Sequence, residues 1–398
     1  MTISTLSFQM NAVNQMDALQ TAMSKTQTQL STGKQIQTAA DNPVGMSQVV
    51  QLNTQLSASQ QYVTNGTLAT TGLNLESQAL TDATNTLQSA RSLIVEANNG
   101  ALNASQRQAI ATQLTQMQQQ LVSIGNRQDG QGNYLFSGYA AGTQPFAQNG
   151  TAVSYQGANQ VNQVQLSADQ SISTGDTGSS VFMNIPAGNG TFTTAAASGN
   201  TGTASVGNGT LTNPSAWVPG NYTITFGTGN TYQITNSAGA SVSSGTYSPD
   251  AGGAFSISFN GAQLSFNGKP AVNDQFTVDA AGSASVFSTI AGAISALTSP
   301  TLNAAQVTTQ LNGMLQQMDG ALNNFNQVSA SVGARLNAVA TASSSAQSTQ
   351  TDLQTTISKI SYTNYSSATT QLSTEELALQ AAQASYASMM QLTLFKYI

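Results

Sequence analysis

The sequence contains neither cysteine nor histidine in its 398 residues. Without cysteine there can be no disulfides, thiolate metal sites or cysteine nucleophiles. Histidine is the commonest general base and the commonest metal ligand, so its absence excludes most hydrolytic triads and zinc sites. We therefore expect a protein that is not an enzyme and that uses no cofactor and no metal.

Charge is also scarce. Charged residues make up 6% of the chain, against about 25% in an average soluble protein. The net charge of −6 and the scattered basic residues argue against nucleic acid as a partner. No apolar run approaches the roughly 18 residues of a membrane span, and the first residues lack the pattern of a Sec signal peptide. Weak charge causes little mutual repulsion, which favours the close packing of many copies.

Glycine is rare at both ends of the chain: 25 of the 34 glycines lie between Gly125 and Gly282. The ends carry heptad patterns and the middle alternates, so the predicted class is α+β with several domains. A long α-helical coiled-coil or bundle rod is expected from both chain ends, with an inserted, mainly β outer domain. Three domains are predicted. Residues 1–45 with 361–398 form a terminal coiled coil that is disordered in the monomer, and residues 46–150 with 286–360 form a helical rod with β-hairpin elements. Residues 151–285 form the β-rich outer domain.

Heptad seams with 4-3 spacing run through both ends. The first seam stops at Gly33, Asp41-Asn42-Pro43 is a turn or helix-start signal, and the next helical run is expected to begin near Met46. The terminal stripes are narrow and rich in Met and Ala, so these helices are marginal alone in water and are expected to order against neighbouring copies. The predicted interface of the assembled inner tube comprises Met16, Leu19, Met23, Leu30, Leu372, Leu379, Ala382, Tyr386 and Met389.

The middle of the chain reads as β-structure. Alternating runs at 255–259 and 262–266 flank Asn260-Gly261, a strong hairpin signal, and 222–226 with 232–234 predicts a second hairpin. A closing strand is expected at 276–278. The tract 188–209 is rich in small and polar residues and is expected to be an exposed loop. Trp217 is expected to anchor the core of this small domain.

Two N-terminal segments carry a family resemblance. The stretches 29–36 and 39–45 resemble the N-terminal region of the flagellin-like family of bacterial flagella, which includes flagellin and the hook–filament junction protein. Thr2 stands where the family usually has Arg, and Asn42 where most members have Asp. The matching motif residues are Leu30, Ser31, Thr32, Gly33, Asp41 and Pro43.

A third segment distinguishes the junction protein from flagellin within that family. Residues 126–130 and 133–138 look like the junction protein's helix-to-β transition rather than flagellin's. Turns here are expected to end the third helix and to launch a strand with Tyr134 and Phe136 on one face. The segment 268–278 resembles a strand motif found in hook-associated proteins, and the ending 392–398 is similar to the family's short apolar terminus. The motif residues of the transition are Asn133, Tyr134, Leu135, Phe136, Ser137 and Gly138.

The resemblance implies a structural adaptor that joins hook to filament and lets flagellin polymerise on the hook. Implied partners are flagellin, the first hook–filament junction protein, an export chaperone, the flagellar type III export apparatus and further copies in a ring. The implied location is extracellular, in the flagellum, after secretion. Two other functions stay open: a flagellin filament subunit, and a secreted adhesin whose β domain binds a surface or a glycan.

Overall fold

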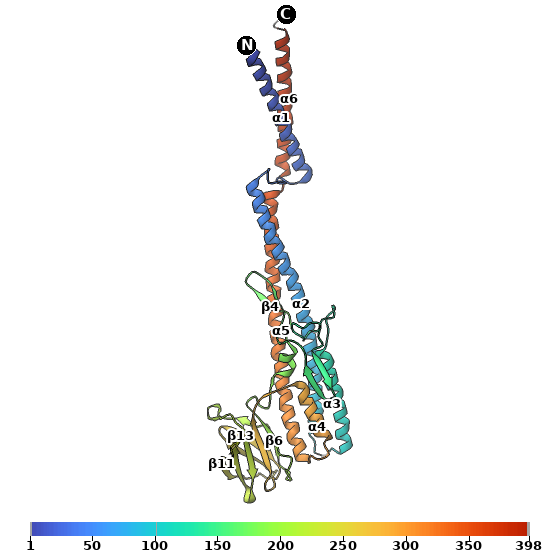
Figure 1. Cartoon of the computed structure of the whole chain (residues 1–398), viewed down its shortest axis with the longest axis vertical. Coiled ribbons are helices and arrows are strands. Elements are labelled where there is room, and N and C mark those ends of the chain that lie inside the picture. Colours follow the sequence, from blue (N-terminus) through green and yellow to red (C-terminus); the bar gives the residue numbers. More distant parts are fainter. Residues whose placement is uncertain (1, 101, 396–398) are drawn as a thin grey trace. The chain divides into compact units, whose positions relative to one another are not determined.

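The computed structural model describes residues 2–100 and 102–395, so part of the apolar ending at 392–398 lies outside the described residues. It divides into two compact units, a terminal unit of residues 1–64 with 343–398 and a central unit of residues 65–342. The predicted class is confirmed, because both ends are helical and the region between them is mainly β (Figure 1). The helices are α1 (Thr2–Thr32), α2 (Pro43–Ala97), α3 (Ala104–Gly125), α4 (Val286–Thr298), α5 (Ala304–Ser361) and α6 (Tyr365–Phe395).

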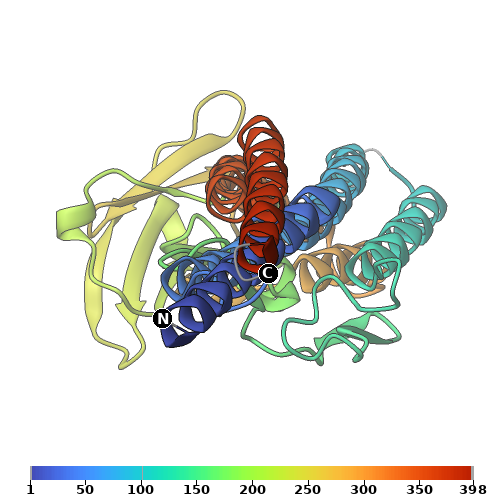
Figure 2. The same ribbon diagram turned by 90° about the horizontal axis from the view of Figure 1, so that it is seen from above.

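The core of the central unit's helical body follows the heptads. The repeating Leu73, Leu80, Leu87 and Ile94 of α2 are all fully buried, as the seven-residue spacing predicted. They share one hydrophobic cluster with the 4-3 positions of α5, and α3 packs beside α4 (Figure 2). The buried seam positions of α5 are Leu311, Met318, Phe325, Val332 and Val339.

Short hairpins and a π-helical turn complete this helical body. Strand β1 pairs with β2, β3 with β4, and β5 with β15, all antiparallel. The π-helix η1 (Ser179–Met183) places Phe182 at the centre of an aromatic cluster. The strands are β1 (Phe146–Asn149), β2 (Ala152–Tyr155), β3 (Gln163–Gln165), β4 (Ser171–Ser173), β5 (Ile185–Pro186) and β15 (Ser283–Ala284).

The β region between β5 and β15 forms two sheets around a second core. One sheet has the order β11-β10-β9-β14-β6, and the other has the order β12-β13-β7 with β8 also paired to β13. Both predicted hairpins are confirmed, and Phe255 faces Phe266 across the Asn260-Gly261 turn. The strands are β6 (Phe192–Ala196), β7 (Ser205–Val206), β8 (Thr210–Leu211), β9 (Tyr222–Phe226), β10 (Thr231–Asn236), β11 (Ser241–Thr246), β12 (Ala254–Phe259), β13 (Ala262–Asn267) and β14 (Gln275–Ala280).

Two expectations for this region have opposite outcomes. The expected loop at 188–209 is wrong, because β6 pairs with β14 and Phe192 and Val206 are buried in the second core. Tertiary pairing overrides the weak strand propensity of the small polar residues around them. The expected role of Trp217 is confirmed, since its ring lies 5.1 Å from Phe192 and 5.8 Å from Tyr222.

Polar contacts join the β sheets to the start of α5. The buried Gln306 forms a capping box with Asn303, and its amide nitrogen lies 3.0 Å from the carbonyl oxygens of both Ala197 and Ser198. The hydroxyl of Thr309 accepts the Val206 N–H at 3.1 Å. The β sheets are thus held to the helical body inside the central unit. The three predicted domains stay a prediction.

Candidate functional site

The predicted assembly surface lies on α1 and α6, which pack side by side in the terminal unit (Figure 1). All nine predicted seam residues have intermediate exposure, so the pairing of α1 with α6 leaves each of them partly accessible. The amide of Gln9 donates to the sulfur of Met390 at 3.3 Å near the free ends of the pair. Packing of these residues in an assembled tube stays a prediction.

The terminal unit exposes much of its apolar surface. Among its described residues, the buried apolar side chains are Ile36, Val49, Ala346 and Ala368. Phe8, Met10 and Leu377 are 54%, 60% and 67% exposed. Two paired helices cannot cover all of each other's apolar faces, so this surface can gain free energy by meeting further helices.

The loop between α1 and α2 holds the first family motif. Gly33 ends α1 with a φ of +68°, where a side chain would be strained. Its carbonyl accepts the Thr363 N–H at 2.9 Å, and the Gln35 N–H donates to the Ser361 carbonyl at 2.7 Å. The loop from α1 to α2 is therefore tied by main-chain bonds to the loop from α5 to α6. The sequence predicted the end of α1 and marked Asp41-Asn42-Pro43, where α2 starts, but it did not predict this pairing.

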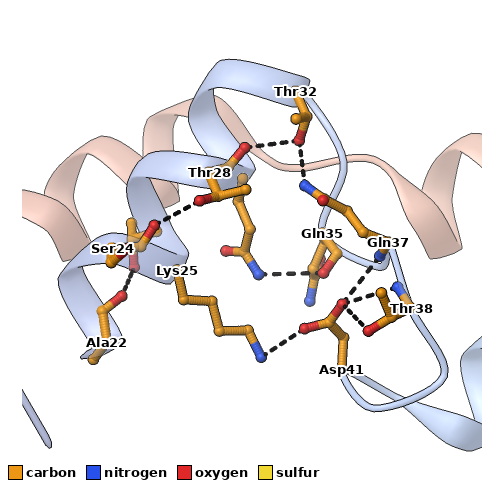
Figure 3. Close-up of polar contacts among 11 residues, drawn as sticks. Ala22, Ser24, Lys25, Thr28, Thr32, Gln35, Gln37, Thr38 and Asp41 are labelled. Carbon is orange, nitrogen blue, oxygen red and sulfur yellow. Dashed lines mark hydrogen bonds and ion pairs between the residues drawn. The ribbon is translucent and has the colours of Figure 1, made fainter.

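Asp41 organises that loop (Figure 3). Its carboxylate accepts the N–H groups of Thr38 and Gln37 at 3.0 and 3.2 Å and the Thr38 hydroxyl at 3.1 Å. Lys25 of α1 lies 3.1 Å away. The Thr38 N–H, Lys25 and the Gln37 N–H, in that order, lower the pKa of Asp41 from 3.8 to about 2. The next residue, Asn42, accepts the Gly45 N–H at 2.9 Å and so caps α2.

We expect Asp41→Asn to loosen this loop. The amide removes the ion pair with Lys25 and replaces an acceptor oxygen with a donor group, so amide exchange of residues 33–42 at pH 6 should accelerate. In the wild type, the stabilisation is present above pH 3.8 and is lost as the pH falls through about 2, because the folded state holds the carboxylate ionised. The variant should lack this acid step. Asp17→Asn, at an exposed α1 carboxylate, is the control, and equal exchange in both variants would contradict the role of Asp41.

The second family motif forms a compact turn in the central unit. The expected turn does form, because the Asp129 carboxylate accepts the N–H groups of Gln131 and Asn133 at 2.8 and 2.9 Å. The expected strand at 134–136 is wrong: Tyr134 makes only an isolated bridge to Gln128, because the chain turns again at once and the Ser137 hydroxyl donates to the Tyr134 carbonyl at 2.9 Å. Phe136 is fully buried.

Gly138 closes that turn. It has a φ of +62°, and a Cβ there would lie 2.5 Å from the Ala158 carbonyl oxygen. Any other residue would meet both backbone strain and this close contact. The motif's glycine is therefore required by packing rather than by chemistry.

The described residues contain no group of three or more carboxylate, imidazole or thiol side chains placed to hold a metal ion. The buried Asp274 is satisfied by main-chain N–H groups of Ala271, Thr201 and Gly202 at 2.8 to 3.1 Å. It thus fixes the turn before β14. No helix in the described part of the chain has the length and hydropathy needed to cross a membrane. What the structure does present is the half-covered helical surface of the terminal unit.

Two family models match the chain. The bacterial flagellin N-terminal helical region matches residues 3–141, and the D2-like domain of flagellar hook-associated protein 1 matches residues 195–280. Flagellar hook-associated protein 3 of Escherichia coli (strain K12) is 36% identical over 158 residues, which is 39% of this chain and 49% of that protein. The matched region thus spans about half the length of this curated relative.

Solved structures are similar over far more of the chain. FlgL of Xanthomonas campestris is 32% identical with a TM-score of 0.71, covering 77% of this chain and 99% of that one. Hook-associated protein 3 of Legionella pneumophila is 29% identical with a TM-score of 0.73, covering 78% and 98%. The likeness thus includes nearly the whole of each solved chain, helices and β region together. The chain belongs to the family of FlgL, flagellar hook-associated protein 3.

Proposed function

We propose that this chain is a structural adaptor subunit of the bacterial flagellum that forms the junction between hook and filament and lets flagellin polymerise on the hook. The observation that carries the proposal is the likeness to FlgL over almost the full length of the solved chains. It is supported by the helical terminal unit, which leaves large apolar side chains exposed.

In this proposal the terminal helices of several copies pack into an inner tube, and the copies form a ring. The ring contacts the first hook–filament junction protein on one side and flagellin on the other. The β region faces outward. The subunit leaves the cell through the flagellar type III apparatus with a dedicated chaperone, acts outside the cell, and catalyses no reaction.

Deletion of the gene in its flagellated host tests the proposal. Electron microscopy should show bare hooks, and flagellin should accumulate in the medium because exported subunits cannot add to the hook. A plasmid copy of the gene should restore filaments. Normal filaments after deletion would contradict the adaptor function and favour the adhesin.

The main alternative is a flagellin filament subunit, which the match of residues 3–141 to a flagellin helical region also allows. The same deletion separates the two functions. Bare hooks without flagellin in the medium would identify this chain as the filament subunit, and quantification of the protein per filament would then give a high copy number.

A further inference from the structure

Glu76 of α2 is a buried carboxyl group without a full set of partners. Its side chain is 2% exposed, and its Oε1 accepts the Asp176 N–H at 3.1 Å. Its Oε2 is buried and receives no hydrogen bond from the described residues. Together with burial, the charge of the Asp176 side chain and a hydrogen bond from that side chain both raise the pKa of Glu76. Two ionised carboxylates have only acceptors, so a bond between them requires that one carries a proton.

Asp176 belongs to a segment that we term the strap, residues 162–178. The strap contains the β3–β4 hairpin and lies against both α2 and α5 (Figure 1). At one end, the Asn65 amide of α2 donates to the Gln165 carbonyl at 2.8 Å. At the other, Arg335 of α5 pairs with the Asp176 carboxylate and donates to the Gly175 carbonyl at 3.2 Å.

We propose that the strap is a pH-sensitive latch, in which a proton shared between Glu76 and Asp176 holds the strap on α2 and α5 and loss of that proton releases it. The titratable groups facing Glu76 are Asp176 from the strap and Arg335 from α5. The turn at Leu135, which also lies close, presents a main-chain carbonyl. With Glu76 ionised, two carboxylates share one guanidinium in a buried site, and a net negative charge remains there.

The titration of Glu76 sets the direction of the effect. Burial first and the charge of Asp176 second raise the pKa of Glu76 from 4.5 to about 8, against the opposing charge of Arg335. The closed strap therefore binds a proton more tightly than the open strap. Stabilisation of the closed state is complete below pH 4.5 and is lost as the pH rises to about 8.

Amide hydrogen exchange on the full-length chain tests the latch. After correction for the intrinsic exchange rate, the opening constant of the strap should rise roughly tenfold per pH unit between pH 5 and 7. Glu76→Gln keeps a donor for Asp176 but cannot ionise, so its opening constant should not change with pH. Glu96→Gln, at an exposed position of the same helix, should behave as the wild type. The same pH dependence in Glu76→Gln as in the wild type would overturn the latch.

A second measurement needs no variant at position 76. The chain has four glutamates, Glu76, Glu96, Glu375 and Glu376. Protein labelled with ¹³C at the glutamate side-chain carboxyl should therefore give four resonances. One of them should titrate near pH 8, with its midpoint shifted when Arg335 is replaced by Gln. Titration of all four below pH 6 would overturn the shared proton.

Discussion

Leu379→Asp is expected to abolish assembly while leaving the central unit folded. Leu379 is half-buried on α6, which packs against α1, and it belongs to the predicted seam. Full burial of a leucine contributes roughly 1.5–3 kcal/mol, and a carboxylate at the same place would add the cost of desolvating a charge. Every copy carries the change, so the loss would recur at each contact in the proposed ring. Filament counts in the complemented deletion host, and thermal unfolding of the purified chain, measure the two effects.

Gln380→Asp is the matched control for that experiment. It adds the same charge at the neighbouring exposed position of α6, so it should reduce assembly far less. Filaments of normal number in the Leu379→Asp strain would refute the seam. Equal losses in both strains would show that added negative charge on α6, rather than burial of the seam, decides assembly.

Regular spacing made much of this fold predictable. The period-seven leucines of α2 require a partner helix on one side, and they are fully buried, as the spacing predicted. The alternation around Asn260-Gly261 specified the register of β12 and β13, because two residues with positive φ fit the turn between them. In both cases the pattern of apolar residues is local and repeats at a fixed spacing along the chain.

Other elements depend on partners distant in the sequence. Helix α4, Val286–Thr298, buries most of its residues and packs against α3, which lies far earlier in the chain. Strand β6 lies in a small, polar tract and is a strand because β14 pairs with it. The strap contact joins Glu76 to Asp176, one hundred residues later, which no spacing rule can detect.

In the candidate site, too, regular spacing predicted the faces of the helices but not the contacts of the loop. The 4-3 spacing predicted which faces of α1 and α6 carry Leu19 and Leu379, and the structure gives both side chains intermediate exposure. The sequence marked Asp41 only as a motif residue. Its role depends on the loop folding back so that Asp41 pairs with Lys25 of α1. The sequence feature that came closest to predicting this role was the position of Asp41, an acidic residue just before Pro43, where α2 starts.

Phe182→Ala is expected to destabilise the helical body of the central unit severely. The side chain is fully buried at the centre of an aromatic cluster. Its removal should cost about 3–5 kcal/mol in total, through the lost burial, the cavity and the lost ring contacts. Total domain stabilities are about 5–15 kcal/mol. The ring centroids within 5.2–5.9 Å of Phe182 are those of Phe136, Phe146, Phe287 and Phe325.

The single tryptophan makes the location of this loss measurable. Trp217 lies beside the β region's own core, which forms a cluster separate from that of Phe182. In urea, the helical circular dichroism signal of Phe182→Ala should be lost at a much lower concentration than in the wild type, while Trp217 fluorescence shifts less. Tyr139→Ala, which removes a ring that is 56% exposed, should change neither. If both signals of Phe182→Ala moved together, the polar contacts of Gln306 would couple the two cores into one cooperative unit.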